Sequence, residues 1–151
     1  KADVQKMFRN IDSETVIPSG VYEKNKKDFE LVLEYVKNDK NVDFDLYNTD
    51  LTDLDKINDD KVKSSIMKIF KDGKFSEIYT YRGSGEKEQR EIQSLKFKTP
   101  NIFYRPGNPV AIIYSIKELY IERYSGITYG YERIGGNWYL EYIQDRNTNS
   151  D

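Results

Sequence analysis

The chain has 151 residues, of which 33% are charged and 14% are aromatic, and its net charge is −2. This length suits one core, so we expect residues 1–151 to form a single domain. The absence of Cys and His excludes disulfides and the usual Cys- or His-based catalytic and metal sites. We therefore expect no metal, no cofactor and no enzymatic activity, and the acidic balance argues against nucleic-acid binding.

Amphipathic helices are predicted in the N-terminal half of the chain. Apolar residues recur at helical spacing over three ranges, 4–11, 25–38 and 59–72. Asn25 is expected to begin the second helix, and Asn58 or Asp59 is expected to cap the third. Gly73 follows the third helix and is predicted to be its left-handed C′ residue.

Strands are predicted where the apolar period changes to two. The expected strands are a short segment over 42–47, and then 75–81, 95–97, 102–105, 110–115 and a final hairpin over 127–143. Phe75, Tyr79 and Tyr81 are expected on one face, matched by Leu95 and Phe97. Residues 110–114 are apolar on both faces and are placed centrally in the sheet.

Three stretches between these elements remain to be assigned. Residues 51–57 fit either one helical turn or a loop, and 82–90 are expected to form a mobile surface loop. Residues 115–124 fit a helix that begins with a capping box at Ser115 and Glu118. They also fit a strand over 119–124, which we favour because Tyr and Ile are frequent in strands.

The final hairpin contains Gly135-Gly136 between two alternating runs, which predicts a two-residue type I′ turn. With that turn, Arg133 faces Trp138, and its guanidinium can lie over the indole. The inner face then carries six large residues that pack on the helices: Ile127, Tyr129, Tyr131, Trp138, Leu140 and Tyr142. Gly130 indicates a bulge in the same strand.

These elements predict an α+β fold. We expect two or three N-terminal helices packed on one face of a five- or six-stranded antiparallel meander sheet. Helices precede strands along the chain, so the sheet is built from the C-terminal half.

The stretch 43–60 is strongly acidic, with seven Asp and one Lys, a local charge of −6 that leaves +4 for the remainder. It fails the EF-hand pattern because Tyr47 and Asn48 replace an oxygen ligand and the turn Gly. Asp side chains also bond local amides in turns and caps. The other interpretation is an acidic face that binds a basic partner, formed by Asp43, Asp45, Asp50, Asp53 and Asp55.

A second pair of acidic residues, Glu132 and Glu141, is expected on the outer face of the final hairpin, with Tyr139 between them. Most glycosidases use two carboxyl groups that face each other across the scissile bond. Nothing in the sequence assigns the role of acid to one of them and the role of base to the other. A hydrolase is therefore the least favoured of three functional hypotheses, and the other two follow.

The leading hypothesis is a non-catalytic bacterial domain, exported or surface-associated, that binds a protein or small ligand through the open face or edge of its sheet. No apolar run approaches the ~20 residues of a membrane span. The chain begins at Lys1, so a signal peptide or lipid anchor would lie upstream, and an extracytoplasmic location is favoured over a cytoplasmic one. The alternative is a cytoplasmic inhibitor or immunity-type protein that presents the acidic segment 43–60 to a basic partner.

Overall fold

The computed structural model describes residues 16–39, 43, 45–83, 90–100 and 108–145. The helices are α2 (Val21–Lys24), α3 (Lys26–Asn38) and α4 (Asp60–Gly73), with a 3₁₀ turn, η1 (Thr52–Lys56). The strands are β1 (Asp45–Tyr47), β2 (Glu77–Arg82), β3 (Ile92–Lys98), β4 (Pro109–Ser115), β5 (Glu122–Tyr124), β6 (Ile127–Gly135) and β7 (Trp138–Asp145). The helix expected over 4–11 and the strand expected over 102–105 lie outside these ranges, as do residues 84–89 of the expected loop.

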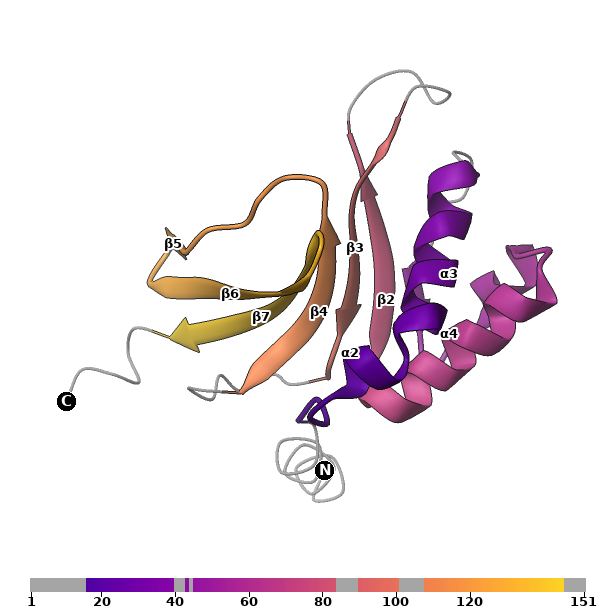
Figure 1. Cartoon of the computed structure of the whole chain (residues 1–151), viewed down its shortest axis with the longest axis horizontal. Coiled ribbons are helices and arrows are strands. Elements are labelled where there is room, and N and C mark those ends of the chain that lie inside the picture. Colours follow the sequence, from indigo (N-terminus) through magenta and orange to yellow (C-terminus); the bar gives the residue numbers. More distant parts are fainter. Residues whose placement is uncertain (1–15, 40–42, 44, 84–89, 101–107, 146–151) are drawn as a thin grey trace.

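The fold is α+β, and the strands form one antiparallel sheet of seven with the order β1-β2-β3-β4-β7-β6-β5. The sheet has seven strands rather than the expected five or six, and its edge strands β1 and β5 have three residues each. It is also not a simple meander. After β4 the chain passes to the far edge, forms β5, and returns through β6 to place β7 beside β4 (Figure 1). The central position predicted for residues 110–114 is confirmed, because β4 is buried along its length.

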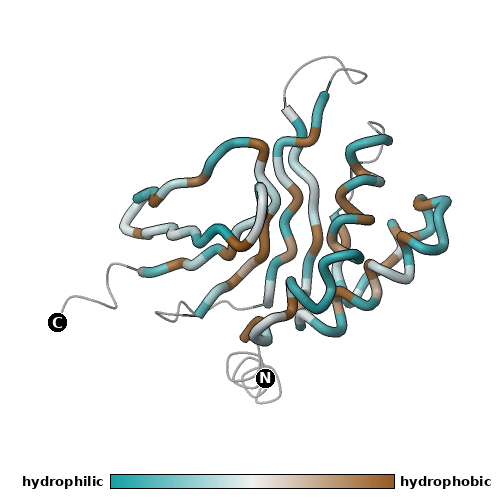
Figure 2. Tube along the Cα trace, in the orientation of Figure 1, coloured by the Kyte–Doolittle hydropathy of each residue, from teal (hydrophilic) through white to brown (hydrophobic). Residues whose placement is uncertain are grey.

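The helices lie on one side of β2, β3 and β4, while β5, β6 and β7 continue the sheet beyond β4 (Figure 1). Phe29 of α3 lies at the centre of the hydrophobic core, with its ring 4.9 Å from that of Phe97 in β3 and 5.5 Å from that of Trp138 in β7. Hydrophobic and hydrophilic residues alternate along the helices and strands (Figure 2). This pattern gives α3 and α4 one apolar face each to bury, and burial of apolar surface is the main driving force for folding.

The ends of the helices follow from three local interactions. Asp59 caps α4 as predicted, and its Oδ1 accepts from the backbone N–H groups of Lys61 and Val62 at 2.9 and 3.2 Å. Asn25 does precede α3, but its amide donates to the carbonyl of Val21 at 3.0 Å, which joins α2 to α3. It makes no side-chain cap at the start of α3.

The prediction for Gly73 was wrong. Gly73 is the last residue of α4, and Lys74 takes the left-handed conformation with φ of 56°. A Cβ on Gly73 would overlap the ring of Phe75. The glycine therefore allows the Phe75 ring to pack against the end of the helix, while its own φ is ordinary.

The face assignment of β2 was also wrong. Ile78 and Thr80 pair with Phe97 and Leu95, so the intervening Tyr79 lies on the opposite face, and Tyr81 with it. Phe75 lies before the strand begins and packs on Phe97 at 5.9 Å between ring centroids. The alternation therefore starts at Glu77, two residues later than the sequence pattern indicated.

The final hairpin is shifted by one residue from the predicted register. The turn residues are Gly136 and Asn137, Gly135 pairs with Trp138, and a bulge follows between Arg133 and Gly135. Only Gly136 takes positive φ, at 53°, whereas Gly135 is a strand residue whose Cβ position lies 3.6 Å from the ring of Tyr22. Because strand side chains alternate, this shift exchanges the faces of one strand relative to the other.

As a result, the six large residues do not share one face. Trp138 is buried on the helix side as predicted, and Leu140 lies beside it on that face. Tyr131 faces Glu141 and Tyr129 faces Ile143 on the opposite side. Gly130 pairs in register with Tyr142, so the bulge predicted at Gly130 occurs nearer the turn.

The ambiguous stretch 115–124 contains no helix. Residues 122–124 form strand β5, and Ser125 and Gly126 make the turn to β6 with φ of 51° and 81°. The preference for a strand is therefore confirmed for these three residues. Residues 116–121 form an irregular connection.

Candidate functional site: the open face of the sheet

The side of the sheet opposite the helices carries polar side chains from several strands, and we call it the open face. The strand registers place five functional side chains on this face, contributed by β2, β3, β6 and β7: Tyr79, Lys96, Tyr131, Tyr139 and Glu141. The face is therefore built from strands far apart in the sequence.

An ion pair between Lys96 and Glu141 lies at the centre of the open face. The Lys96 ammonium is 2.7 Å from Oε1 of Glu141, and the two side chains are 16% and 3% exposed. The hydroxyl of Tyr131 donates to Oε2 of Glu141 at 3.1 Å. Oε1 thus faces the ammonium of Lys96 and Oε2 accepts a hydrogen bond, so the buried negative charge is paired.

The surroundings of Lys96 and Tyr131 determine whether each side chain keeps its proton. Burial opposes the charge on Lys96, but the charge and hydrogen bond of Glu141 outweigh it and raise the pKa of Lys96 above its ordinary value. Burial, together with the charge and hydrogen bond of Glu141, raises the pKa of Tyr131 far above its ordinary value. Both groups keep their protons at neutral pH, so neither is a base or nucleophile there.

The carboxylate pair expected for a hydrolase does not form. Glu132 faces Leu140 and Glu141 faces Tyr131, so the two acids project from opposite sides of the sheet. The prediction that Arg133 lies over Trp138 was wrong for the same reason. Arg133 instead lies over Tyr139 at 5.2 Å and donates to its hydroxyl at 2.7 Å.

Beside the open face, the segment 116–124 exposes large apolar side chains, and we call it the exposed segment. Four large apolar side chains of this segment are exposed, by 41%, 66%, 68% and 75%: Ile116, Tyr120, Ile121 and Tyr124. Glu118 lies within this segment, 3.6 Å from the guanidinium of Arg133. This contact places the segment next to the turn end of β6 and β7, and its last residues form the edge strand β5.

The sequence pattern did not reveal either feature. Neither interpretation of 115–124, as helix or as strand, indicated which of the apolar residues are exposed. Lys96 and Glu141 belong to strands paired with opposite sides of β4, so no local pattern brings them together. The only signal in the sequence for this ion pair was a charged residue between apolar neighbours in a strand.

Asp43 of the acidic stretch is part of an internal network. Its carboxylate lies 2.9 Å from the Nε of Arg82 and 3.1 Å from the guanidinium of Arg90. Arg82 is buried and also donates to the backbone carbonyls of Val36 and Asp39 at 2.7 and 3.0 Å. This network satisfies the C-terminal end of α3, where a cation is favoured. Residue 82 is therefore not part of a surface loop.

The other predicted acidic residues are spread over the surface. Asp50 accepts from the backbone N–H of Thr52 at 3.1 Å, and bonds from Thr52 lower its pKa. Asp53 pairs with Lys56 at 3.0 Å. Asp45 and Asp55 are exposed.

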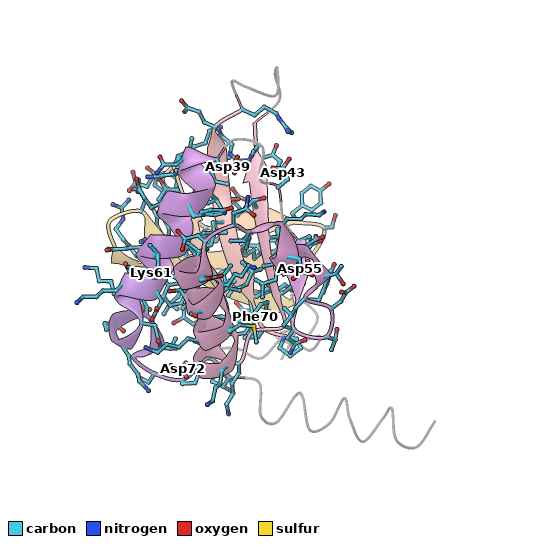
Figure 3. All side chains as sticks on the ribbon, turned by 90° about the vertical axis from the view of Figure 1, so that its right-hand side faces the viewer. Asp39, Asp43, Asp55, Lys61, Phe70 and Asp72 are labelled. Atoms are coloured by element: carbon cyan, nitrogen blue, oxygen red, sulfur yellow. The ribbon has the colours of Figure 1, made fainter. Side chains whose placement is uncertain are left out.

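Figure 3 shows Asp43 close to Asp39 near the end of α3, and Asp55 well apart from both. The five acids therefore do not converge on one point. Their role in binding a partner stays a prediction.

Within the ranges that the structure describes, no group of three or more acidic side chains is arranged to hold a metal ion. None of the described helices has the length and apolar character needed to cross a membrane. Comparison of the chain with protein-family models, with curated proteins and with solved structures found no match.

Proposed function

We propose that this chain is a non-catalytic bacterial domain, exported or surface-associated, that binds a protein partner through the exposed segment. In this proposal the helices cover one face of the sheet, and the exposed segment with the β5 edge remains for the partner. The observation that carries it is that Tyr120, Ile121 and Tyr124 are each at least 66% exposed within five residues.

The exposure of these side chains is costly unless something covers them. Removing one large apolar side chain from water is worth about 1.5–3 kcal/mol. Single exposed apolar residues are common, but a group of them beside an edge strand of the described sheet is typical of an interaction site. Tyrosine in particular is enriched at protein interfaces, because it combines apolar area with a hydroxyl group.

The non-catalytic character is supported by the open face itself. The charges of Lys96 and Glu141 neutralise one another, and the Tyr131 hydroxyl donates to Oε2 of Glu141. A buried ion pair that joins two strands in this way suits a rigid platform. Glu132, the other half of the expected acid pair, lies on the far side of the sheet.

The alternative proposal is an inhibitor that presents the acidic stretch to a basic partner. Asp45, Asp50 and Asp55 are exposed and support it, whereas Asp43 is neutralised by two arginines. The two proposals differ in their response to salt. Binding through acids weakens steeply with ionic strength, while binding through tyrosines does not.

Site-specific photo-crosslinking tests the proposal. The chain carries benzoylphenylalanine at Tyr124, and the control carries it at Tyr81, which is 61% exposed on the distant strand β2. Each labelled chain is mixed with an extract of the organism that encodes the protein, and the mixture is irradiated. We expect a defined product from position 124 that is absent from position 81.

Competition then separates a specific partner from incidental capture. An excess of unlabelled chain should abolish the product, while an excess of the variant Tyr120→Ser/Ile121→Ser/Tyr124→Ser should leave it. Equal competition by both chains, or identical products from both positions, would contradict the proposal. A signal peptide encoded upstream of Lys1 is expected, and a plain cytoplasmic start would contradict the export part.

A further inference from the structure

A cavity of about 330 Å³ lies between the segment that leads into α2 and the helix-side face of β4, β6 and β7. It is distinct from the exposed segment, none of whose residues lines it. Its volume is within the range of small-molecule sites, which begins at about 300 Å³.

One wall of this cavity is apolar and belongs to the core. Val21 and Ile112 are 5% and 0% exposed, and Leu140 and Ile134 continue the wall along the final hairpin. Such side chains are held by dense packing, so the wall is already formed without a ligand. Ile134 and Leu140 are the partly buried members of this wall, and an apolar body can lie against them.

The charged side chains among the described lining residues of the cavity are both acidic. Glu132 lies at its rim, and the hydroxyl of Tyr142 donates to its Oε2 at 3.1 Å, which orients the carboxylate. Glu23 and the ring of Tyr22 also contribute to the lining, and the described lining residues include no Lys or Arg. Two carboxylates without a cation favour a positively charged group.

We propose that this cavity binds a small apolar molecule that carries a cationic amine, with the apolar body on the Ile134 and Leu140 wall and the amine at Glu132. The proposal is independent of the partner surface, because the two sites share no residue. The orienting bond from Tyr142 sets the position of the charge.

Three probes of one shape test the chemical class: 4-phenylbutylammonium, 4-phenylbutanol and 4-phenylbutyrate. Binding is followed by the methyl resonances of Ile112, Ile134 and Leu140, which line the cavity. We expect saturable shifts at these methyl groups, with the amine bound about tenfold more tightly than the alcohol and the carboxylate weakest.

Two variants and a control locate the interaction. Glu132→Gln should remove the tenfold preference for the amine over the alcohol, while Glu34→Gln, an exposed acid on α3 outside the cavity, should retain it. Leu140→Phe should reduce the binding of all three probes by filling the cavity, with folding confirmed by the fluorescence of Trp138. Equal binding of the three probes, shifts confined to other methyl groups, or no saturable shift would each overturn the proposal.

Discussion

Removal of one partner of the Lys96–Glu141 pair should be far more harmful than removal of both. At 2.7 Å the attraction between two unit charges is about 6 kcal/mol at an effective dielectric of 20. Taking each ion out of water costs several kcal/mol, so the pair contributes little in net terms. Lys96→Met abolishes the attraction but leaves the carboxylate of Glu141 buried at 3% exposure.

We therefore expect Lys96→Met to lower the free energy of unfolding by about 3–5 kcal/mol. Glu141→Met should cost less, because the remaining Lys96 is 16% exposed and keeps some contact with water. The double variant Lys96→Met/Glu141→Met should lie within about 2 kcal/mol of the unmodified chain, since it buries no charge.

Urea unfolding at pH 7, followed by circular dichroism, measures all three variants. Lys56→Met is the matched control, because it breaks an ion pair of 3.0 Å whose lysine is 72% exposed, and it should cost less than about 1 kcal/mol. A loss below 1 kcal/mol for Lys96→Met, or a double variant as unstable as the sum of the single ones, would refute this account of the open face.

Three further changes test other parts of the fold by the same unfolding assay. Trp138→Ala removes a 4%-exposed ring that contacts four other rings and should cost about 3–5 kcal/mol; a loss under 1 kcal/mol would show that Trp138 is not part of the core. Asp59→Ala removes the cap of α4 and should cost about 1 kcal/mol; an unchanged stability would show that water replaces the cap without loss. Burial raises the pKa of Glu77, with further contributions from the hydrogen bond and charge of Asp45. Folding therefore disfavours its ionised form; this penalty is present above the folded pKa, is relieved as the pH falls through it, and is gone below the ordinary value of 4.5. Glu77→Gln should thus stabilise the chain by about 0.2–1 kcal/mol at pH 7 and not at pH 4; an equal effect at both pH values would contradict this.

Much of the fold could be predicted because its determinants are local. The Asp59 cap, the two-sided apolar run of β4 and the burial of Trp138 each follow from a few neighbouring residues. The register of the final hairpin could not be predicted, because Gly135 and Gly136 are equivalent in a turn pattern. The choice between them is associated with Tyr22, which packs over Gly135 from a distant part of the chain.

The candidate site was harder to predict than the fold for the same reason. The Lys96–Glu141 pair depends on the strand order, which places β7 next to β4 although β5 and β6 come between them in the sequence. The exposed segment was concealed by the usual assumption that apolar residues are buried. Tyr120, Ile121 and Tyr124 depart from that assumption.

The affinity of the partner for the chain and for Tyr120→Ser/Ile121→Ser/Tyr124→Ser tests the central claim most directly. These side chains are at least 66% exposed. The free energy of unfolding of the variant should therefore lie within about 1 kcal/mol of that of the unmodified chain. Surface plasmon resonance at low and high salt should show binding weakened at least about 100-fold, which is about 2.7 kcal/mol, with little dependence on salt. Affinities within twofold of one another, together with a large loss for Asp45→Asn/Asp55→Asn, would contradict the claim and transfer the binding site to the acidic stretch.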